Sequence, residues 1–212
     1  MQIVGHTFGS RDLVGGHVVL DLVNTVTARS DDPIDWLDGF PRLLDWAELT
    51  GRFDQGALRA LRRRSEADPR AAALALRHTR ELREALLGVL TSVIGAEVLA
   101  APALERLERW WKSAIHLARF DIAEGHVRLD LDVETSGIEY LNHELVLRTF
   151  DLLRILPVER TRICPGCGWV FIDRSKGGRR RWCDMATCGN AAKSRRHYQR
   201  THPRGVGRHR AE

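Results

Sequence analysis

The feature that most limits how this chain can fold is the spacing of its four cysteines. They lie near the end of the chain in two pairs, Cys164 with Cys167 and Cys183 with Cys188. Two residues separate the members of the first pair, 15 separate the two pairs, and four separate the members of the second pair. Two cysteine pairs at such a distance are typical of a site in which four thiolates hold one zinc ion.

The predicted zinc is structural, because four thiolates complete its tetrahedral shell and leave no position for water. The segment around it needs such support. It has about 45 residues, a size at which a metal often supplements the core, and the last leucine of the chain, Leu156, precedes it. Disulfides and free buried thiols are the alternatives. A site of two cysteines with His197 and His202 would leave two cysteines without a role.

Charge divides the chain at the same place. Residues 160–212 contain 14 Lys and Arg against three Asp and Glu, whereas the residues before them contain 19 against 25. The net charge of +5 therefore describes neither part. A basic segment joined to an acidic, leucine-rich one predicts a polyanionic partner for the basic segment.

The composition, with 43% hydrophobic and 29% charged residues, is that of a folded soluble protein and excludes collagen and low-complexity disorder. No apolar run is long enough for a membrane span, and residues 1–24 lack the pattern of a signal peptide. We therefore expect a cytoplasmic protein without a membrane partner. Its cysteines should be reduced, which favours metal over disulfides.

Residues 1–158 are expected to form a mainly α-helical domain with a small antiparallel β-sheet. Residues 18–23 are compatible with either a buried strand or a short helix. Alternating apolar residues predict a strand at 126–133, paired with residues 119–123 in a hairpin. Apolar spacing and capping residues predict helices at 36–49, 55–64, 69–94, 102–118 and 138–156.

Residues 159–202 are expected to form a treble-clef-like zinc finger, a β-hairpin followed by a helix. The turn holding Cys164 and Cys167 would lead into a strand at 169–172, and a helix from Cys188 to Arg200 would follow the last ligand. Trp169, Phe171, Ile172 and Trp182 would be its small core. A flexible basic tail is expected at 203–212. Since the helical domain has its own core, Cys183→Ser is expected to unfold the finger alone.

Basic side chains crowd around this finger. Lys193, Arg196 and Arg200 are three and four residues apart, so they share one helix face on which like charges repel each other. Binding to a phosphate backbone explains this crowding better than solvation does. The candidate nucleic-acid contacts are Arg174, Lys176, Arg179, Arg180, Arg181, Asn190, Lys193, Arg195, Arg196, Gln199 and Arg200.

The helical domain contains no standard catalytic motif. His143 and Glu144 begin like a zinc-protease helix, but Leu147 stands where the second histidine is needed. Glycine-rich phosphate loops and nucleophile elbows are also missing, so we do not expect an enzyme. Asp21 and Asn24 are unusual polar residues in an apolar run. Either they bridge backbone groups, or they line a pocket for a small-molecule effector.

Several short motifs resemble a known family. Residues 171–175, 180–185 and 188–193 are similar to the CGNR zinc finger, and residues 16–25 and 43–46 resemble the ABATE domain that precedes it in that family. The resemblance implies Cys164, Cys167, Cys183 and Cys188 as the ligands of one zinc, duplex DNA as partner and a role in stress-induced transcription regulation. The arginine for which the finger is named is Ala191 in this chain.

We therefore expect a zinc-dependent, DNA-binding transcription regulator of bacterial type, whose N-terminal domain senses a small ligand or forms a homodimer. One alternative is an adaptor that binds RNA or protein through the same finger. The other is an enzyme with its site in the N-terminal domain.

Overall fold

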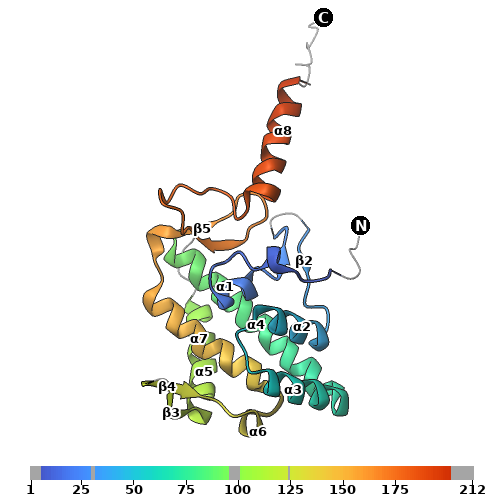
Figure 1. Ribbon diagram of the computed structural model, residues 1–212, viewed down its shortest axis with the longest axis vertical. Helices are drawn as coiled ribbons and strands as arrows, with labels where there is room; N and C mark the ends of the chain where they lie inside the picture. The colour runs from blue at the N-terminus through green and yellow to red at the C-terminus, as the bar shows by residue number, and fades with distance from the viewer. Residues whose placement is uncertain (1–5, 30–31, 96–100, 124, 202–212) are drawn as a thin grey trace, which may run out of the picture.

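The computed structural model describes residues 6–29, 32–95, 101–123 and 125–201, arranged as shown in Figure 1. The expected basic tail, residues 203–212, lies outside the described residues. The described N-terminal part is mainly helical and includes α1 (Val18–Val23), α2 (Phe40–Thr50), α3 (Gln55–Ala67), α4 (Pro69–Val93), α5 (Ala101–Leu117), α6 (Val133–Ser136) and α7 (Tyr140–Ile155).

The described strands form three antiparallel pairs. Two pairs belong to the helical part, β1 (Val26–Thr27) with β2 (Ile34–Asp35), and β3 (Arg119–Ala123) with β4 (His126–Asp130). In the finger, β5 (Thr161–Ile163) pairs with β6 (Val170–Ile172), and α8 (Asn190–Thr201) follows. The predicted fold class is confirmed in both parts.

Local sequence signals set the ends of several helices. The carboxylate of Asp54 accepts a hydrogen bond from Ala57 N at 2.7 Å and begins α3. Asp68 ends α3 and begins α4, where its carboxylate accepts from two backbone N–H groups. Gly51 ends α2 in the left-handed conformation, with a φ of 61°. The predicted boundaries at Gly51 and Asp68 are confirmed.

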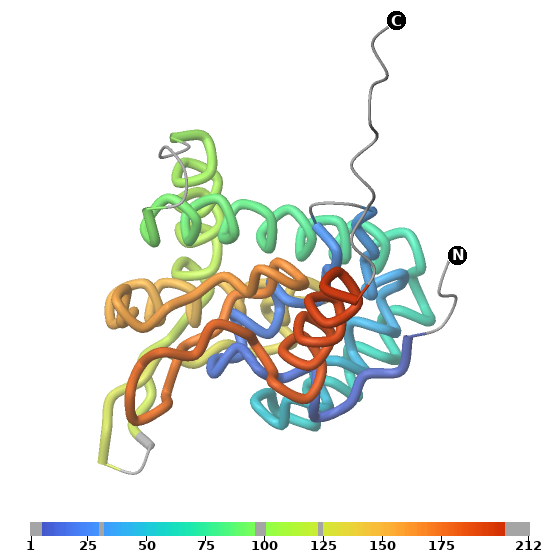
Figure 2. The backbone as a smooth tube through the Cα atoms, turned by 90° about the horizontal axis from the view of Figure 1, so that it is seen from above, coloured from blue at the N-terminus to red at the C-terminus, as the bar shows by residue number. Residues whose placement is uncertain are grey.

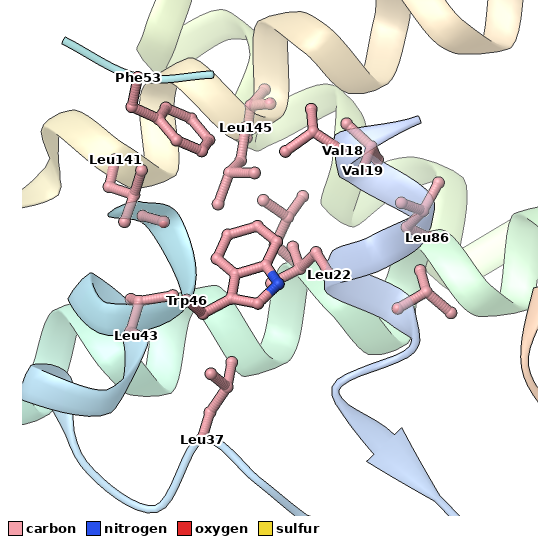
Figure 3. Close-up of a cluster of buried hydrophobic side chains, with 14 of the residues drawn as sticks. Val18, Val19, Leu22, Leu37, Leu43, Trp46, Phe53, Leu86, Leu141 and Leu145 are labelled. Carbon is pink, nitrogen blue, oxygen red and sulfur yellow. The ribbon is translucent and has the colours of Figure 1, made fainter. Parts of the chain in front are cut away.

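The core surrounds α1, whose six residues are all buried. Leucine and valine side chains from α1, α2, α4 and α7 meet around the indole of Trp46, as Figure 3 shows. A helix buried on every side shows no amphipathic period. This explains why the pattern of residues 18–23 was compatible with both a strand and a helix.

The helix predicted to end at Arg64 continues to Ala67. Two further predicted boundaries are wrong. The helix predicted to start at Trp36 begins at Phe40, because the chain before it forms β2 and the Asp35 carboxylate accepts a hydrogen bond from Leu37 N at 3.0 Å. The strand predicted over residues 126–133 ends at Asp130, because the side chain of Asp132 caps α6. In both places an aspartate makes a local backbone bond that competes with the predicted element.

The finger lies against the end of the helical part that carries α1 and β2, and α8 projects away from it (Figure 1). Viewed from above, α8 stands over the helical part, and the β3–β4 hairpin extends sideways near the edge of the molecule (Figure 2). None of the described helices is both long enough and apolar enough to cross a membrane.

Candidate metal centre and nucleic-acid interface

The four cysteine sulfurs converge on one point. They all lie within 4.8 Å of one another, with Cys167 Sγ 3.5 Å from Cys183 Sγ and Cys183 Sγ 3.7 Å from Cys188 Sγ. Four sulfurs about 2.3 Å from a zinc ion would be separated by about 3.8 Å. The cluster therefore fits one zinc, as predicted, and its four thiols are not joined by disulfides.

The first ligand pair lies in the tight turn between β5 and β6. Gly168 N donates to Cys164 O at 2.9 Å, and the φ of Gly168 is 79°, which favours glycine. Hydrogen bonds from the thiols of Cys167 and Cys183 lower the pKa of Cys164, and the backbone N–H of Gly166 acts in the same direction. The turn thus directs the Gly166 N–H at a ligand sulfur, which favours its thiolate form.

The second ligand pair is held by a π-helical turn, Met185–Gly189, that leads into α8. Asp184 begins this turn, since its carboxylate accepts from Ala186 N and Thr187 N, each at 3.2 Å. A Cβ on Gly189 would lie 2.8 Å from the Met185 sulfur, so glycine lets that side chain pack against the turn. The turn fixes Cys188 at the base of α8 and attaches that helix to the metal centre.

The basic loop, residues 173–181, is organised by the carboxylate of Asp173. This side chain is 1% exposed and accepts from Ser175 N at 2.9 Å and Arg180 N at 2.8 Å. Hydrogen bonds from Ser175 and from the backbone N–H of Arg180 lower the pKa of Asp173 to about 2. Arg160 supports the loop from outside, with Nη1 donating to Ser175 O at 3.0 Å. The loop therefore presents its cations from a fixed backbone.

The α8 helix carries the most accessible of the predicted nucleic-acid contacts. Ala192 is its single buried residue among those described, and the helix contains no acidic side chain. A helix that is polar on nearly all sides can present most of its surface to a partner. The exposed candidate residues on it are Asn190, Lys193, Arg195, Arg196, Gln199 and Arg200.

Two of the predicted contacts in the loop already have partners within the protein. Arg180 Nε donates to Trp182 O at 2.9 Å, and the guanidinium lies 4.9 Å from the centre of the Phe171 ring. Arg174 Nη2 donates to Gly16 O at 2.6 Å. Arg180 therefore supports the finger, whereas Arg174 links the finger to the helical part.

The other three loop candidates, Lys176, Arg179 and Arg181, are exposed. Arg181 lies over the ring of Trp182, with its guanidinium 5.2 Å from the ring centre. These side chains extend the positive surface from α8 to the loop.

His197, considered as an alternative zinc ligand, is exposed on α8 and is not part of the cysteine cluster. Its proposed companion, His202, lies outside the described residues.

Asn24 joins the helical part to the finger. Its side-chain Nδ2 donates to Val170 O at 2.9 Å, and its Oδ1 accepts from Val170 N at 2.8 Å. The amide thus satisfies both backbone groups of one β6 residue, as a neighbouring strand would. Val170 is fully buried and belongs to the same apolar cluster as the leucines of the helical part. The two parts of the chain therefore share a core.

Further contacts surround this link. Trp169 Nε1 donates to Val26 O at 3.1 Å, and the Trp169 ring meets the ring of Trp36 edge-on at 5.5 Å. Ile172 N donates to Gly15 O at 2.9 Å. Of the predicted finger core, Trp169, Phe171 and Trp182 pack together, and Val14 and Trp36 of the N-terminal segment complete their cluster. The prediction is wrong for Ile172, which packs against the core of the helical part.

Asp21 supports the same segment. Its Oδ1 accepts from Gly15 N at 2.8 Å, and burial raises its pKa to about 6, although the Gly15 bond and Arg52 act to lower it. Asp21 and Asn24 therefore bridge backbone groups, as one of the two interpretations held. Neither side chain lines the adjacent cavity beside Gly16, and the pocket interpretation stays a prediction.

A module in which a β-hairpin and a helix place four cysteines around one zinc site defines a zinc-finger protein. The CGNR zinc finger model matches residues 160–201. The ABATE model, described as "Putative stress-induced transcription regulator", matches residues 16–148, more than half of the chain. The chain therefore belongs to the ABATE family and carries a CGNR zinc finger. No curated protein matches it.

Sequence reasoning missed two residues that shape the site. Asp173 lies within the motif at residues 171–175 without a predicted role, although an acidic residue among basic ones is itself a signal of a structural bond. Arg160 shows no such signal. Its role depends on Gly178, whose φ is 59° and where a Cβ would lie 2.7 Å from Arg160 Nη1.

Proposed function

We propose that this protein is a zinc-dependent, DNA-binding regulator of transcription. The observation that carries the proposal is α8, which projects from a rigid zinc centre and carries four exposed Lys or Arg and no acidic residue. The exposed loop cations Lys176, Arg179 and Arg181 lie on the same finger. An α-helix fits the major groove of duplex DNA, and cations beside it can bind the phosphates.

The description of the family to which the chain belongs favours a transcription regulator rather than an enzyme. The four unlinked thiols suit a reducing compartment such as the cytoplasm, where we place the protein. The acidic helical part would be repelled by DNA, which helps orient the protein with α8 toward the duplex. In this proposal the helical part forms a homodimer or senses a small molecule.

The test is a salt titration of binding to a duplex of mixed sequence, measured by fluorescence anisotropy with the zinc-loaded protein. The triple variant Lys193→Ala, Arg196→Ala and Arg200→Ala should bind at least tenfold more weakly at low salt. Its plot of log affinity against log salt should be shallower by about 2 to 3, because each lost phosphate contact removes about 0.9 from the slope.

The control removes the same charge from the helical part with Arg59→Ala, Arg63→Ala and Arg70→Ala, all at exposed positions. If both triple variants lose equal affinity, net charge and not α8 is responsible. Stronger binding to structured RNA than to duplex DNA would favour the adaptor alternative. Binding that does not depend on salt would contradict the proposal.

A further inference from the structure

We propose that a cavity between the helical part and the finger binds a small organic anion with an apolar body. The cavity has a volume of about 550 Å³, within the range of small-molecule sites. Gly16 and His17 form one wall, the end of α7 with Leu152 and Ile155 forms the second, and the finger contributes the segment 172–176 and Arg160.

The charge of the lining favours an anion. Arg160, Arg174 and Lys176 contribute three cations, and Asp173 is the one carboxylate among the lining residues. Both oxygens of Asp173 already accept backbone hydrogen bonds. Arg160 and Arg174 each have one guanidinium nitrogen bonded to a backbone carbonyl. Since a guanidinium has five N–H donors, both retain donors for a ligand.

His17, in the wall of the cavity that it forms with Gly16, is a polar but uncharged side chain. Burial lowers its pKa, as do Arg148, Arg52 and Arg174, while Asp151 acts in the opposite direction. The ring is therefore neutral at pH 7. Its Nδ1 accepts from Val19 N at 3.3 Å, so the proton of the neutral ring is on Nε2, which can donate.

The apolar part of the lining separates this ligand from inorganic phosphate or a DNA phosphate. Ile155 ends α7 and remains 77% exposed, although the cations lie beside it. Leu152, Pro157 and Ile172 continue the apolar surface. Inorganic phosphate gains no binding energy from these apolar side chains. A carboxylate or phosphate ester with an alkyl or aryl group can contact both the cations and the apolar side chains.

The position of the cavity gives the ligand a means of regulation. Its walls belong to both parts of the molecule, and Arg174 already connects them through Gly16 O. A ligand that binds Arg174 and Lys176 would hold the basic loop, which also carries Arg179 and Arg181. Occupancy should therefore change the affinity for DNA. This consequence rests on the proposed function, while ligand binding itself does not.

The test is calorimetric titration of the zinc-loaded full chain with four probes: acetate, octanoate, inorganic phosphate and phenyl phosphate. Octanoate should bind at least tenfold more tightly than acetate, and phenyl phosphate at least tenfold more tightly than phosphate. Ile155→Ser should abolish this difference between large and small probes. Arg174→Gln should weaken every probe at least fivefold, and Arg195→Gln, a control on α8, should weaken none.

Three results would overturn the proposal. These are no binding of octanoate or phenyl phosphate, equal affinity for phosphate and phenyl phosphate, and binding that both cavity variants leave unchanged. The DNA titration is then repeated with saturating octanoate or phenyl phosphate. A twofold or larger change supports the regulatory step, and no change overturns that step alone. Loss of DNA binding by the α8 triple variant is measured without these probes, so failure of the proposed function is recognised separately.

Discussion

The helical part and the zinc finger reach a stable fold in different ways. The helical part buries a large set of leucine, valine and aromatic side chains around α1 and Trp46. The finger's own buried cluster consists of two cysteines and two aromatic residues, Trp169 and Phe171. It depends on zinc at one end and on the segment 13–29 at the other. The zinc site and the N-terminal segment thus both stabilise the finger. The contrast shows that a small module can complete its hydrophobic core by packing against a neighbouring domain.

The largest expected effect comes from breaking the metal centre with Cys183→Ser. Zinc binding contributes about 10 kcal/mol to the folding of such modules, so residues 161–201 should lose their protection against hydrogen exchange. The segments on either side of α1, residues 13–16 and 24–27, should lose protection with them, because Gly15 O, Asn24 and Val26 O are bonded to the finger. The middle of α4 should remain protected.

Sequence alone predicted an unaffected helical domain, and hydrogen exchange separates the two expectations. Wild-type protein treated with a chelator is the matched comparison. If residues 13–16 and 24–27 stay fully protected in both samples while the finger unfolds, the two parts are more independent than their contacts indicate.

The second-largest effect is expected from breaking the hydrogen bonds between Asn24 and Val170. Asn24→Ala would leave Val170 N–H and C=O buried without partners, and each such group costs about 1–3 kcal/mol. We expect a loss of about 3 kcal/mol in the free energy of unfolding, measured by urea denaturation. Zinc should also be removed more easily by a competing chelator.

Asn24→Asp is the control for this prediction. Its carboxylate can still accept from Val170 N, but it cannot donate to Val170 O and would be a buried charge beside that oxygen, so the zinc affinity should fall at least as far as in Asn24→Ala. An unchanged zinc affinity in Asn24→Ala would show that the finger does not need the helical part.

Asp21 provides a smaller effect that depends on pH. Its pKa is raised from 3.8 to about 6 in the folded chain. A carboxyl group shifted in this direction stabilises the fold fully below about pH 4, and this contribution is lost as the pH rises through 6. Asp21→Asn keeps an acceptor for Gly15 N and carries no charge. The variant should therefore be more stable than wild type by about 2 kcal/mol at pH 7.5.

The measurement is urea unfolding of the zinc-loaded wild type and Asp21→Asn between pH 5 and 8. The difference between the two proteins should shrink toward pH 5, and the pH dependence of the zinc site cancels because both carry it. Parallel pH profiles would mean that Asp21 does not titrate in this range.

The two parts also differ in how far the sequence predicts them. Helices α3 and α4 are predictable because Asp54 and Asp68 mark their starts locally, and the zinc site is predictable because its ligands follow fixed spacings. The strand β2 is not predictable, because its two residues directly precede Trp36 and their sequence is equally compatible with the first turn of a helix. The Asn24–Val170 link is also hidden, because residues 146 positions apart are brought together only by the packing of α1 against β6.

The same limit applies to the basic residues. Their number predicts a polyanionic partner, but sequence cannot show which of them are already occupied. Arg180 is drawn onto Phe171 and Trp182, and Arg174 onto Gly16, whereas the cations of α8 remain exposed. Which cations are bonded within the protein and which remain exposed depends on the path of the loop around Asp173. That path is set by tertiary contacts and not by local sequence.

The smallest expected effect tests the departure from the family motif. Ala191 is exposed near the start of α8, where the finger's name-giving arginine would stand. If that position faces DNA, Ala191→Arg adds one phosphate contact, raises the affinity at low salt about three- to tenfold and steepens the salt slope by about 1. Ala191→Gln is the control, because glutamine has a similar helix propensity and no charge. Equal affinities of the two variants would place position 191 away from the phosphates, and the contact surface would then lie on the face that carries Lys193, Arg196 and Arg200.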